Sequence, residues 1–457
     1  MPVEYQPHPA SFRDPSGFVY RKNGTLYRQV NQCFRNEFEA FMSSGLYERF
    51  TNEGSLLPFR QRAEVLTGDP EGYATLEPDP LSFVSYPWEW SFDMLKDAAR
   101  CTLHLLRGSV ANGFILKDAT PFNVQWYRGQ MTWIDSLSFE RHDPARPWVA
   151  YRSFCEQFLA PLLLMHYSRQ PLQGLHLAWP EGIPLRTASK LLPFRSRFSL
   201  HTWLHVHLHA RMTIRKRPNQ KITPFSLKKM TDLITSLELL VQRLRLPECK
   251  TGWSDYYSEA AGRGDYLDTK KRIVNEWIDR LGSITNCADL GANDGTFSRL
   301  TADRGIFTIA ADADAACVNR LYRSLRDTAS PLHPLVCDIA NPAPGTGVLN
   351  TEQSPLLNRI PSDLVLALGL VHHLAIARNM PLSLITELLA RCTRKWLIVE
   401  FIPKTDEKVQ SMLAHRKDVF PSYDQQAFEQ SLRSTFHIED SRPIAESGRT
   451  LYLASKT

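Results

Sequence analysis

Four aspartates recur at nearly equal intervals along the C-terminal half of the sequence. They are 23, 26 and 25 residues apart, and each lies near one end of a short apolar run: Asp289, Asp312, Asp338 and Asp363. One strand with its crossover helix occupies about that length of chain. Apolar runs of this kind are typical of parallel strands that are buried on both faces. The spacing therefore predicts a doubly wound α/β domain in this half of the chain.

The apolar runs also place the individual elements. Five strands are predicted, at residues 287–290, 307–311, 334–337, 363–368 and 396–401. Helices are predicted between them, at residues 296–304, 315–325 and 382–393. Open parallel sheets bind ligands outside the carboxyl ends of their strands. We therefore expect most of the four aspartates to line that edge of the sheet.

A glycine-containing loop follows the first predicted strand and reads D-L-G-A-N-D-G-T-F-S from Asp289 onward. Gly291 and Gly295 allow a tight turn and a close approach of the backbone to a ligand. Asn293 takes the place of a third glycine, which is tolerable because asparagine adopts positive φ more readily than most residues. Asp312 follows Gly291 by 21 residues, where a carboxylate can accept hydrogen bonds from both hydroxyls of a ribose.

These residues resemble motif I and the two following acidic positions of class I S-adenosylmethionine (SAM) dependent methyltransferases. L-A-L-G-L-V-H-H-L, residues 366–374, resembles the fourth-strand motif of many small-molecule methyltransferases. The resemblance implies a Rossmann-like seven-stranded methyltransferase domain, with Asp312 on the ribose and Asp338 near the adenine. It implies that SAM is bound by Asp289, Gly291, Asn293, Gly295, Asp312 and Asp338. NAD-dependent dehydrogenases share the pattern of glycine and acid and are the competing class, but their G-x-G-x-x-G spacing is absent.

Three residues are candidates for catalysis: His372, His373 and Glu400. They are expected at the ends of the fourth and fifth strands, facing the transferred methyl group. Methyl transfer requires positioning and deprotonation of the acceptor, and histidine is a suitable base near neutral pH. Two adjacent histidines on a strand end would point to opposite faces. The alternative is that one histidine packs structurally while the other only lines the site.

The N-terminal half contains a second pattern, L-K-D-A-T-P-F-N-V-Q-W-Y-R-G-Q-M-T-W-I-D from Leu116 to Asp135. Asp118, Asn123 and Asp135 have the spacing of the catalytic segment of aminoglycoside-phosphotransferase-like and other kinase-like enzymes. In such enzymes the first aspartate orients the acceptor hydroxyl, and the asparagine and second aspartate hold magnesium beside ATP. Lys117 and the residues after Asp135 depart from the family pattern. The alternatives are a degenerate kinase-like domain or an unrelated α+β domain that binds the acceptor.

The predicted organisation is an α+β domain over residues 1–248 followed by the methyltransferase domain over residues 249–457. Stretches at 85–99, 253–257, 364–382 and 400–409 resemble the rhizobial host-specificity nodulation methyltransferases over most of the chain. The resemblance implies a two-part SAM-dependent methyltransferase. A small-molecule or glycan acceptor is favoured, whereas a bifunctional protein with a phosphotransferase-like half and a non-catalytic SAM sensor are alternatives.

Charge and cysteine usage bear on partners and compartment. The net charge is +6, and residues 201–250 alone carry ten Lys or Arg against three acids. A nucleic acid or an acidic protein that docks on the basic 211–229 segment is the alternative partner, although no aromatic residues interleave with the basic run. No apolar run is long enough to span a bilayer, and the eight cysteines show no C-x-x-C pair. These features predict a cytoplasmic protein with reduced thiols; the oligomeric state is not determined by them.

Overall fold

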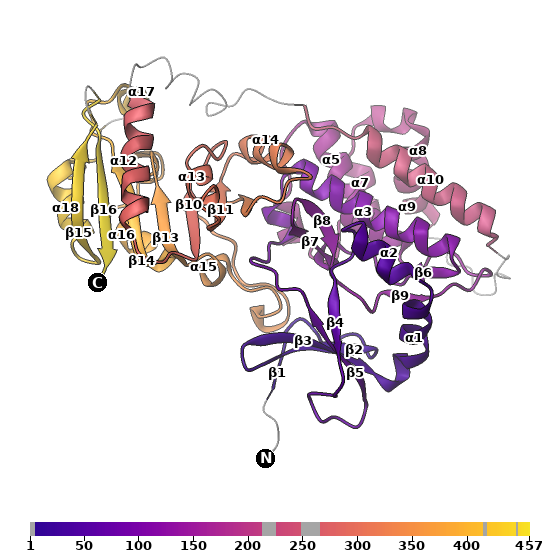
Figure 1. Ribbon diagram of the computed structural model, residues 1–457. Coiled ribbons are helices and arrows are strands. Elements are labelled where there is room, and N and C mark those ends of the chain that lie inside the picture. The colour runs from indigo at the N-terminus through magenta and orange to yellow at the C-terminus, as the bar shows by residue number, and fades with distance from the viewer. Residues whose placement is uncertain (1–4, 213–224, 248–265, 415–417, 445–446) are drawn as a thin grey trace. The chain divides into compact units, whose positions relative to one another are not determined.

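The structure, a computed structural model, describes residues 5–212, 225–247, 266–414, 418–444 and 447–457 (Figure 1). The chain divides into two compact units. Unit 1 consists of Met1–Pro247 with Gly345–Ser354, and unit 2 consists of Glu248–Pro344 with Pro355–Thr457. The predicted boundary between residues 248 and 249 falls outside the described residues and stays a prediction, as does the W-S-D-Y-Y segment at 253–257.

Unit 2 contains a seven-stranded sheet in the order β12-β11-β10-β13-β14-β16-β15. The five strands β10 to β14 pair in parallel, whereas β16 is antiparallel to both of its neighbours. The strands are β10 (Asn286–Leu290), β11 (Phe307–Asp312), β12 (Leu332–Val336), β13 (Ser362–Ala367), β14 (Thr393–Phe401), β15 (Phe436–Pro443) and β16 (Thr450–Lys456). A sheet of mostly parallel strands is therefore confirmed, and all five predicted strands are present.

The helices of unit 2 lie between the strands. They are α12 (Tyr266–Arg280), α13 (Ser298–Ala302), α14 (Ala315–Leu325), α15 (Leu356–Arg359), α16 (Leu382–Cys392), α17 (Glu407–Leu413) and α18 (Gln425–Leu432), with a π-helical turn η8 (His373–Ala377). The 3-10 turn η7 (Val348–Asn350) belongs to the segment Gly345–Ser354, which is part of unit 1. Helix α12 buries Ile273, Val274 and Trp277 against β10, β13, β14 and β16. The predicted helices at 296–304, 315–325 and 382–393 correspond to α13, α14 and α16.

The order of the strands places their carboxyl ends at one edge of the sheet. In the parallel register Asp289 pairs with Ala310, and Asp312 pairs with Val336, so Asp289, Asp312 and Asp338 follow one another along this edge. Asp363 is different because it lies at the start of β13, where it accepts hydrogen bonds from Thr285 and Lys395. Three of the four recurring aspartates therefore share the expected edge.

Unit 1 begins with an antiparallel sheet in the order β1-β2-β3-β5-β4. Its strands are β1 (Gln6–Pro7), β2 (Gly17–Lys22), β3 (Thr25–Asn31), β4 (Phe59–Arg62) and β5 (Gly72–Pro78). Two short pairs follow, β6 (Phe114–Leu116) with β9 (Phe139–Arg141) and β7 (Val124–Tyr127) with β8 (Gln130–Trp133). The β2–β3 hairpin turns at Asn23-Gly24, where both residues have positive φ.

The rest of unit 1 is helical. Its helices are η1 (Gln32–Phe34), α1 (Arg35–Ser43), α2 (Leu46–Asn52), η2 (Pro87–Glu89), α3 (Phe92–Ala111), η3 (Pro121–Asn123), α4 (Tyr151–Phe154), η4 (Cys155–Leu159), α5 (Ala160–Ser168), α6 (Leu175–Ala178), α7 (Leu185–Leu191), η5 (Phe194–Phe198), α8 (Leu200–Thr202), η6 (Trp203–Leu208), α9 (His209–Met212) and α10 (Leu227–Arg243). Helices α1 and α2 are separate because Gly45, between them, has a φ of 76°. A kinase-like fold for this half stays a prediction.

The seven described cysteines are free thiols, and five of them are buried. Among the described helices none combines the length and the hydropathy that a membrane crossing requires.

Candidate functional site

A cavity of about 250 Å³ opens at the carboxyl ends of the strands of unit 2. It lies beside the loop that follows β10 and is walled by the ends of β11 and β13 and by the turn η8. Its lining residues are Leu290, Gly291, Asn293, Ala311, Asp312, Ala313, Asp314, Cys337, Asp338, Ile339, Leu368, Gly369, Leu370, His373, Leu374, Ala377 and Arg378. Open parallel sheets bind ligands at this edge.

The loop after β10 has the backbone conformation that its sequence predicts. Gly291 and Gly295 have φ values of 80° and 81°, and Asn293 has a φ of 52°. The asparagine therefore adopts the left-handed conformation that a glycine would otherwise supply. Gly291 lines the cavity, but Gly295 does not. A Cβ atom on Gly295 would lie 2.8 Å from Leu321 Cδ1 on α14, so this glycine allows the loop to pack closely on that helix.

Asp312 ends β11 and faces both the loop and the cavity. Its Oδ2 accepts a hydrogen bond from the Asn293 backbone N–H at 2.7 Å, and its Oδ1 accepts one from the Asp314 N–H at 2.7 Å. Burial raises the pKa of Asp312, although these two backbone hydrogen bonds oppose the shift. A carboxylate has about four lone-pair positions, so each oxygen of Asp312 keeps capacity for a hydroxyl donor in the cavity.

Asp338 follows β12 on the far side of the cavity. Its Oδ1 accepts a hydrogen bond from the Ala340 N–H at 3.1 Å, and its Oδ2 pairs with the guanidinium of Arg378. Arg378 comes directly after the turn η8 and also lines the cavity. Sequence reasoning did not find Arg378, because its partner is 40 residues away and no spacing within the motif points to it.

Asp289 lies beneath the cavity rather than in it. It is buried, and the Ser298 hydroxyl donates a hydrogen bond of 2.6 Å to its Oδ2. Burial raises the pKa of Asp289 to about 7, with the hydrogen bond from Ser298 opposing the shift. Its side chain joins β10 to α13 and does not line the cavity, and its contact with SAM stays a prediction.

The two histidines lie after β13 rather than on its end. The residue before η8 is His372, His373 begins this turn, and their ring centroids are 3.8 Å apart. The prediction that they point to opposite faces is wrong, because a helical turn replaces the extended backbone that it assumed. His373 lines the cavity, whereas His372 is 2% exposed and does not. Its Nδ1 has no hydrogen-bond partner among the described residues.

Both imidazoles are held neutral. Burial and the charge of Arg449 lower the pKa of His373 to about 4. Burial, followed by the charges of His373, Arg449 and Lys270, lowers the pKa of His372 well below its usual value. Only a neutral imidazole can accept a proton, so His373 is in the form that a general base requires at pH 7.

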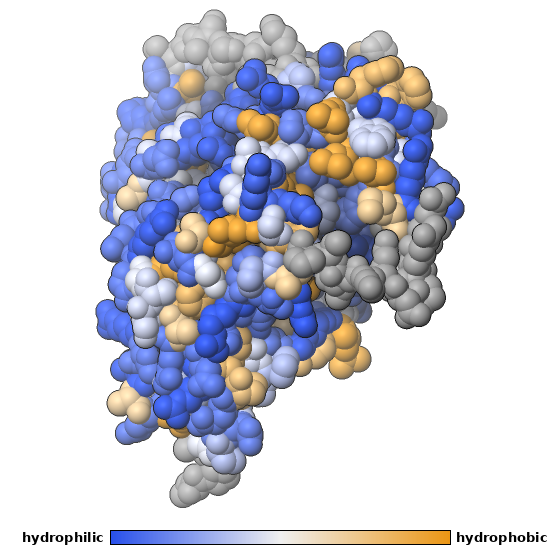
Figure 2. Space-filling view, turned by 90° about the vertical axis from the view of Figure 1, so that its right-hand side faces the viewer, coloured by the Kyte–Doolittle hydropathy of each residue, from blue (hydrophilic) through white to orange (hydrophobic). Residues whose placement is uncertain are grey.

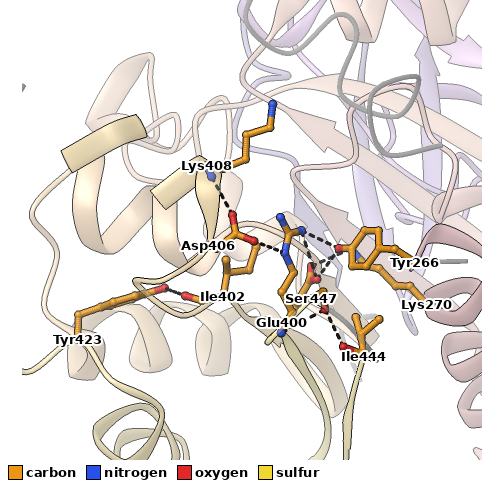
Figure 3. A network of polar contacts seen from close by, with 10 residues as sticks. Tyr266, Lys270, Glu400, Ile402, Asp406, Lys408, Tyr423, Ile444 and Ser447 are labelled. Atoms are coloured by element: carbon orange, nitrogen blue, oxygen red, sulfur yellow. Dashed lines mark hydrogen bonds and ion pairs between the residues drawn. The ribbon is translucent and has the colours of Figure 1, made fainter. Parts of the chain in front are cut away.

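Glu400 belongs to a buried network and not to the cavity. Its Oε2 accepts a hydrogen bond from Lys270 Nζ at 2.7 Å, and its Oε1 accepts one from the Tyr266 hydroxyl at 2.8 Å. Figure 3 shows Tyr266 and Lys270 reaching Glu400 from α12. Arg449 donates to the Tyr266 hydroxyl and to Asp406, at 2.7 and 2.8 Å.

The network balances two cations against two carboxylates in a region closed to water. Lys270 and Arg449 are 1% and 2% exposed, and Glu400 is fully buried. Burial opposes ionisation of Glu400, but the charges of Lys270 and Arg449 and the hydrogen bonds outweigh it and lower the pKa. The structure places Glu400 in this buried network, outside the lining of the cavity, and its role in catalysis stays a prediction.

In unit 1 the three residues of the kinase-like pattern come close together but do not form a cation site. Arg28 Nη2 lies 2.7 Å from Asp135 Oδ1, and Asn123 Nδ2 donates to Asp135 Oδ2 at 3.5 Å. Asp118 is half-buried, and burial and the charge of Asp135 raise its pKa to about 6. A guanidinium and an amide N–H therefore hold Asp135 where magnesium would need free carboxylate oxygens. Within the described ranges no group of three His, Cys, Asp or Glu side chains could hold a metal ion.

A curated protein is similar in sequence over almost the whole chain. The nodulation protein NoeA of Rhizobium meliloti (strain 1021) is 31% identical, over 97% of this chain and 94% of its own length. The chain belongs to the NoeA family. The resemblance to rhizobial nodulation proteins is thus confirmed, and no family model matches the sequence.

Solved structures that resemble this NoeA-family chain include several methyltransferases. The N-methyltransferase NodS of Bradyrhizobium japonicum WM9 is 10% identical with a TM-score of 0.32, covering 42% of this chain and 97% of its own. Magnesium protoporphyrin IX methyltransferase of Synechocystis PCC 6803, with bound SAM, is 14% identical with a TM-score of 0.30. The match covers 46% of this chain and 87% of the methyltransferase. The bifunctional kinase-methyltransferase WbdD is 20% identical with a TM-score of 0.29. The match covers 42% of this chain and 39% of WbdD. These values alone establish no shared activity.

Proposed function

We propose that this protein is a SAM-dependent methyltransferase whose acceptor is a small molecule or a glycan. The single observation that carries the proposal is the cavity at the strand ends, where the loop with Gly291 and Asn293 faces the carboxylate of Asp312. The order of the seven strands, with β16 inserted antiparallel between β14 and β15, is the arrangement that the class I resemblance implies.

The residues of the cavity fit SAM in their chemistry. Asp312 offers carboxylate oxygens to the two ribose hydroxyls, and Gly291 leaves the backbone open for a close approach. Cys337, Ile339 and Leu374 supply an apolar wall for the adenine, with Asp338 and Arg378 at its edge. A cavity with mostly apolar walls and a few placed polar groups is typical of a cofactor site.

SAM supplies a methyl group bonded to a positively charged sulfur. A nucleophile on the acceptor forms a bond to the methyl carbon as the carbon–sulfur bond breaks, and S-adenosylhomocysteine is the leaving group. The chain holds His373 neutral, so an imidazole nitrogen can take the proton from the acceptor hydroxyl or amine as the new bond forms. His372 packs against His373, while burial and then the charge of Arg449 keep both rings neutral. Glu400 holds Lys270 of the same network by a hydrogen bond. Glu400 is thus a positioning residue in this proposal.

The experiment begins with calorimetric titration of the purified chain with S-adenosylhomocysteine (SAH). Micromolar affinity is expected. The chain is then incubated with SAM labelled in its methyl group and with small-molecule, glycan, RNA and protein fractions of a cell extract, with His373→Gln as the matched variant.

Label in the small-molecule or glycan fraction that is lost in His373→Gln supports the proposal. Label in RNA or protein would instead support the alternative that the basic segment docks a macromolecule. SAH affinity without label in any fraction would indicate a SAM sensor. We propose the cytoplasm as the compartment, in agreement with the free thiols.

A further inference from the structure

The helical part of unit 1 contains a long stretch without a carboxylate. No Asp or Glu occurs between Glu181 and Asp232, and the same stretch carries eleven Lys or Arg. The predicted basic segment 211–229 is its second half, and most of that segment lies outside the described residues. The first half, from α7 to α9, is described. It combines its positive charge with apolar side chains that are not buried.

Six large apolar side chains in this part are exposed to water, and four of them lie close together in the sequence. Phe198 is 80% exposed, Leu200 72%, Phe194 68% and Leu191 57%. Soluble proteins expose single apolar residues commonly, but a cluster of large ones is a sign of an interaction site. These four residues, together with Arg195 and Arg197, are called the Phe194 patch below.

The Phe194 patch is held in a fixed shape by buried side chains below it. Leu192 and Ser196 are buried and alternate with the exposed residues. His207 bridges the segment, since its Nδ1 pairs with the Ser189 hydroxyl at 2.8 Å and its Nε2 with the Ser196 hydroxyl at 2.9 Å. The exposure of the phenylalanines is therefore built into the fold.

Cationic and apolar groups are interleaved on the patch. The Phe194 and Phe198 ring centroids are 5.5 Å apart, and Arg197 Cζ lies 5.3 Å from the centroid of Phe194. Arg195 extends to Tyr167, where it donates to the backbone carbonyl at 2.7 Å. Figure 2 shows the face to which α8, α9 and α10 at the right-hand edge of Figure 1 belong, and apolar groups gather in its upper part among hydrophilic ones.

We propose that the Phe194 patch docks the protein onto the surface of a membrane that contains anionic lipids. Aromatic and aliphatic side chains enter the boundary between headgroups and acyl chains, while flanking arginines pair with lipid phosphates. A lipid surface accepts leucines and phenylalanines alike. A single-stranded nucleic acid would stack its bases on the rings but would gain nothing from Leu191 and Leu200. All the formally charged side chains between Glu181 and Asp232 are Lys or Arg, and this positive charge complements the negative surface of an anionic membrane.

The test is co-sedimentation of the full chain with vesicles of phosphatidylcholine, with and without phosphatidylglycerol. Binding is expected only with the anionic lipid, and it should weaken as salt increases because the attraction is screened. Phe194→Ser combined with Phe198→Ser should lower the partition coefficient by at least about tenfold. Arg197→Gln should lower it by about fivefold.

Phe12 provides a matched control in unit 1. It is 58% exposed, and Arg13 Cζ lies 4.4 Å from its ring centroid. Phe12→Ser therefore removes an exposed ring beside an arginine without touching the patch, and vesicle binding should not change. All variants should keep the SAH affinity of the original chain, which shows that they are folded.

Three results would overturn the proposal. The first is an absence of binding to anionic vesicles, or binding that the Phe194 and Phe198 substitutions leave unchanged. The second is self-association in light scattering that these substitutions abolish, which would make the patch an interface between two copies. The third is binding of RNA in preference to vesicles, lost in the same variants.

Discussion

The carboxylate of Asp312 combines two roles at the scale of single residues. It accepts the Asn293 and Asp314 N–H groups and so fixes the loop after β10, and it faces the cavity. Ser298 and Asp289 perform a similar structural task below the cavity without reaching it. Asp312 and Asp289 therefore differ in function, because the Asp312 side chain lines the cavity whereas the Asp289 side chain is buried beneath it.

Asp312→Ala should weaken the binding of SAH by about 1.5–3 kcal/mol, because it removes hydrogen bonds to a charged group. Calorimetric titration measures this as a loss of affinity of about 10- to 150-fold. Asp294→Ala is the matched control, because Asp294 only binds the Thr296 backbone and hydroxyl and does not line the cavity. Equal affinity in the two variants would remove Asp312 from the proposed site.

His373 should stay neutral through the physiological pH range. Its pKa of about 4 means that the ring is protonated only as the pH falls below about 5, and a base of this kind loses its function on acidification. An NMR titration of the imidazole carbon-bound protons between pH 5 and 8 measures this, with the signal assigned by its absence in His373→Gln. A midpoint near 6.5 would show that burial and Arg449 do not act on the ring as described.

At the scale of elements, the Glu400 network joins α12 to β14 and to Arg449, just before β16. Its members are far apart in the sequence, since Lys270 and Glu400 are separated by 130 residues. Replacing one partner of a buried ion pair leaves an uncompensated charge, whereas replacing both removes the cause of the penalty. The network should therefore behave as a unit in mutagenesis.

Glu400→Gln should lower the free energy of unfolding by about 3–5 kcal/mol, because Lys270 and Arg449 would then face only one carboxylate. Denaturant unfolding of Glu400→Gln, Lys270→Met and the double variant measures the coupling. The double variant should be more stable than the sum of the single losses predicts. If Glu400→Gln instead abolished methyl transfer with no loss of stability, Glu400 would contact the acceptor after all.

At the scale of the whole molecule, the side-chain contacts of unit 1 were harder to predict from the sequence than the strands of unit 2. The hairpin around Arg128-Gly129 forms as its residues indicate, with both at positive φ, and it brings Asn123 near Asp135. The pairing of Asp135 with Arg28, 107 residues earlier, is not visible in any local pattern. It occupies one carboxylate oxygen of the residue that the kinase-like alternative assigns to magnesium, and that alternative stays a prediction.

The whole chain should accordingly bind SAH but show no magnesium-dependent affinity for ATP. Two calorimetric titrations of the same preparation, one with SAH and one with ATP in the presence and absence of magnesium, check this. Asp135→Ala serves as the control. Magnesium-dependent ATP binding that this variant abolishes would make unit 1 a phosphotransferase-like domain and support a bifunctional protein.

The sequence by itself determined the five parallel strands of unit 2 with three of its helices, the left-handed turn at Asn293 and the edge where the cavity lies. These features depend on apolar periodicity and on the backbone preferences of neighbouring residues, which a single sequence contains. Only the tertiary structure decided that Asp289 and Glu400 are buried, that the two histidine rings contact each other at a tilt, and that Arg378 and Arg28 pair with distant aspartates. Those outcomes depend on which side chains meet after folding and on the loss of water around them, and neither is encoded in local spacing.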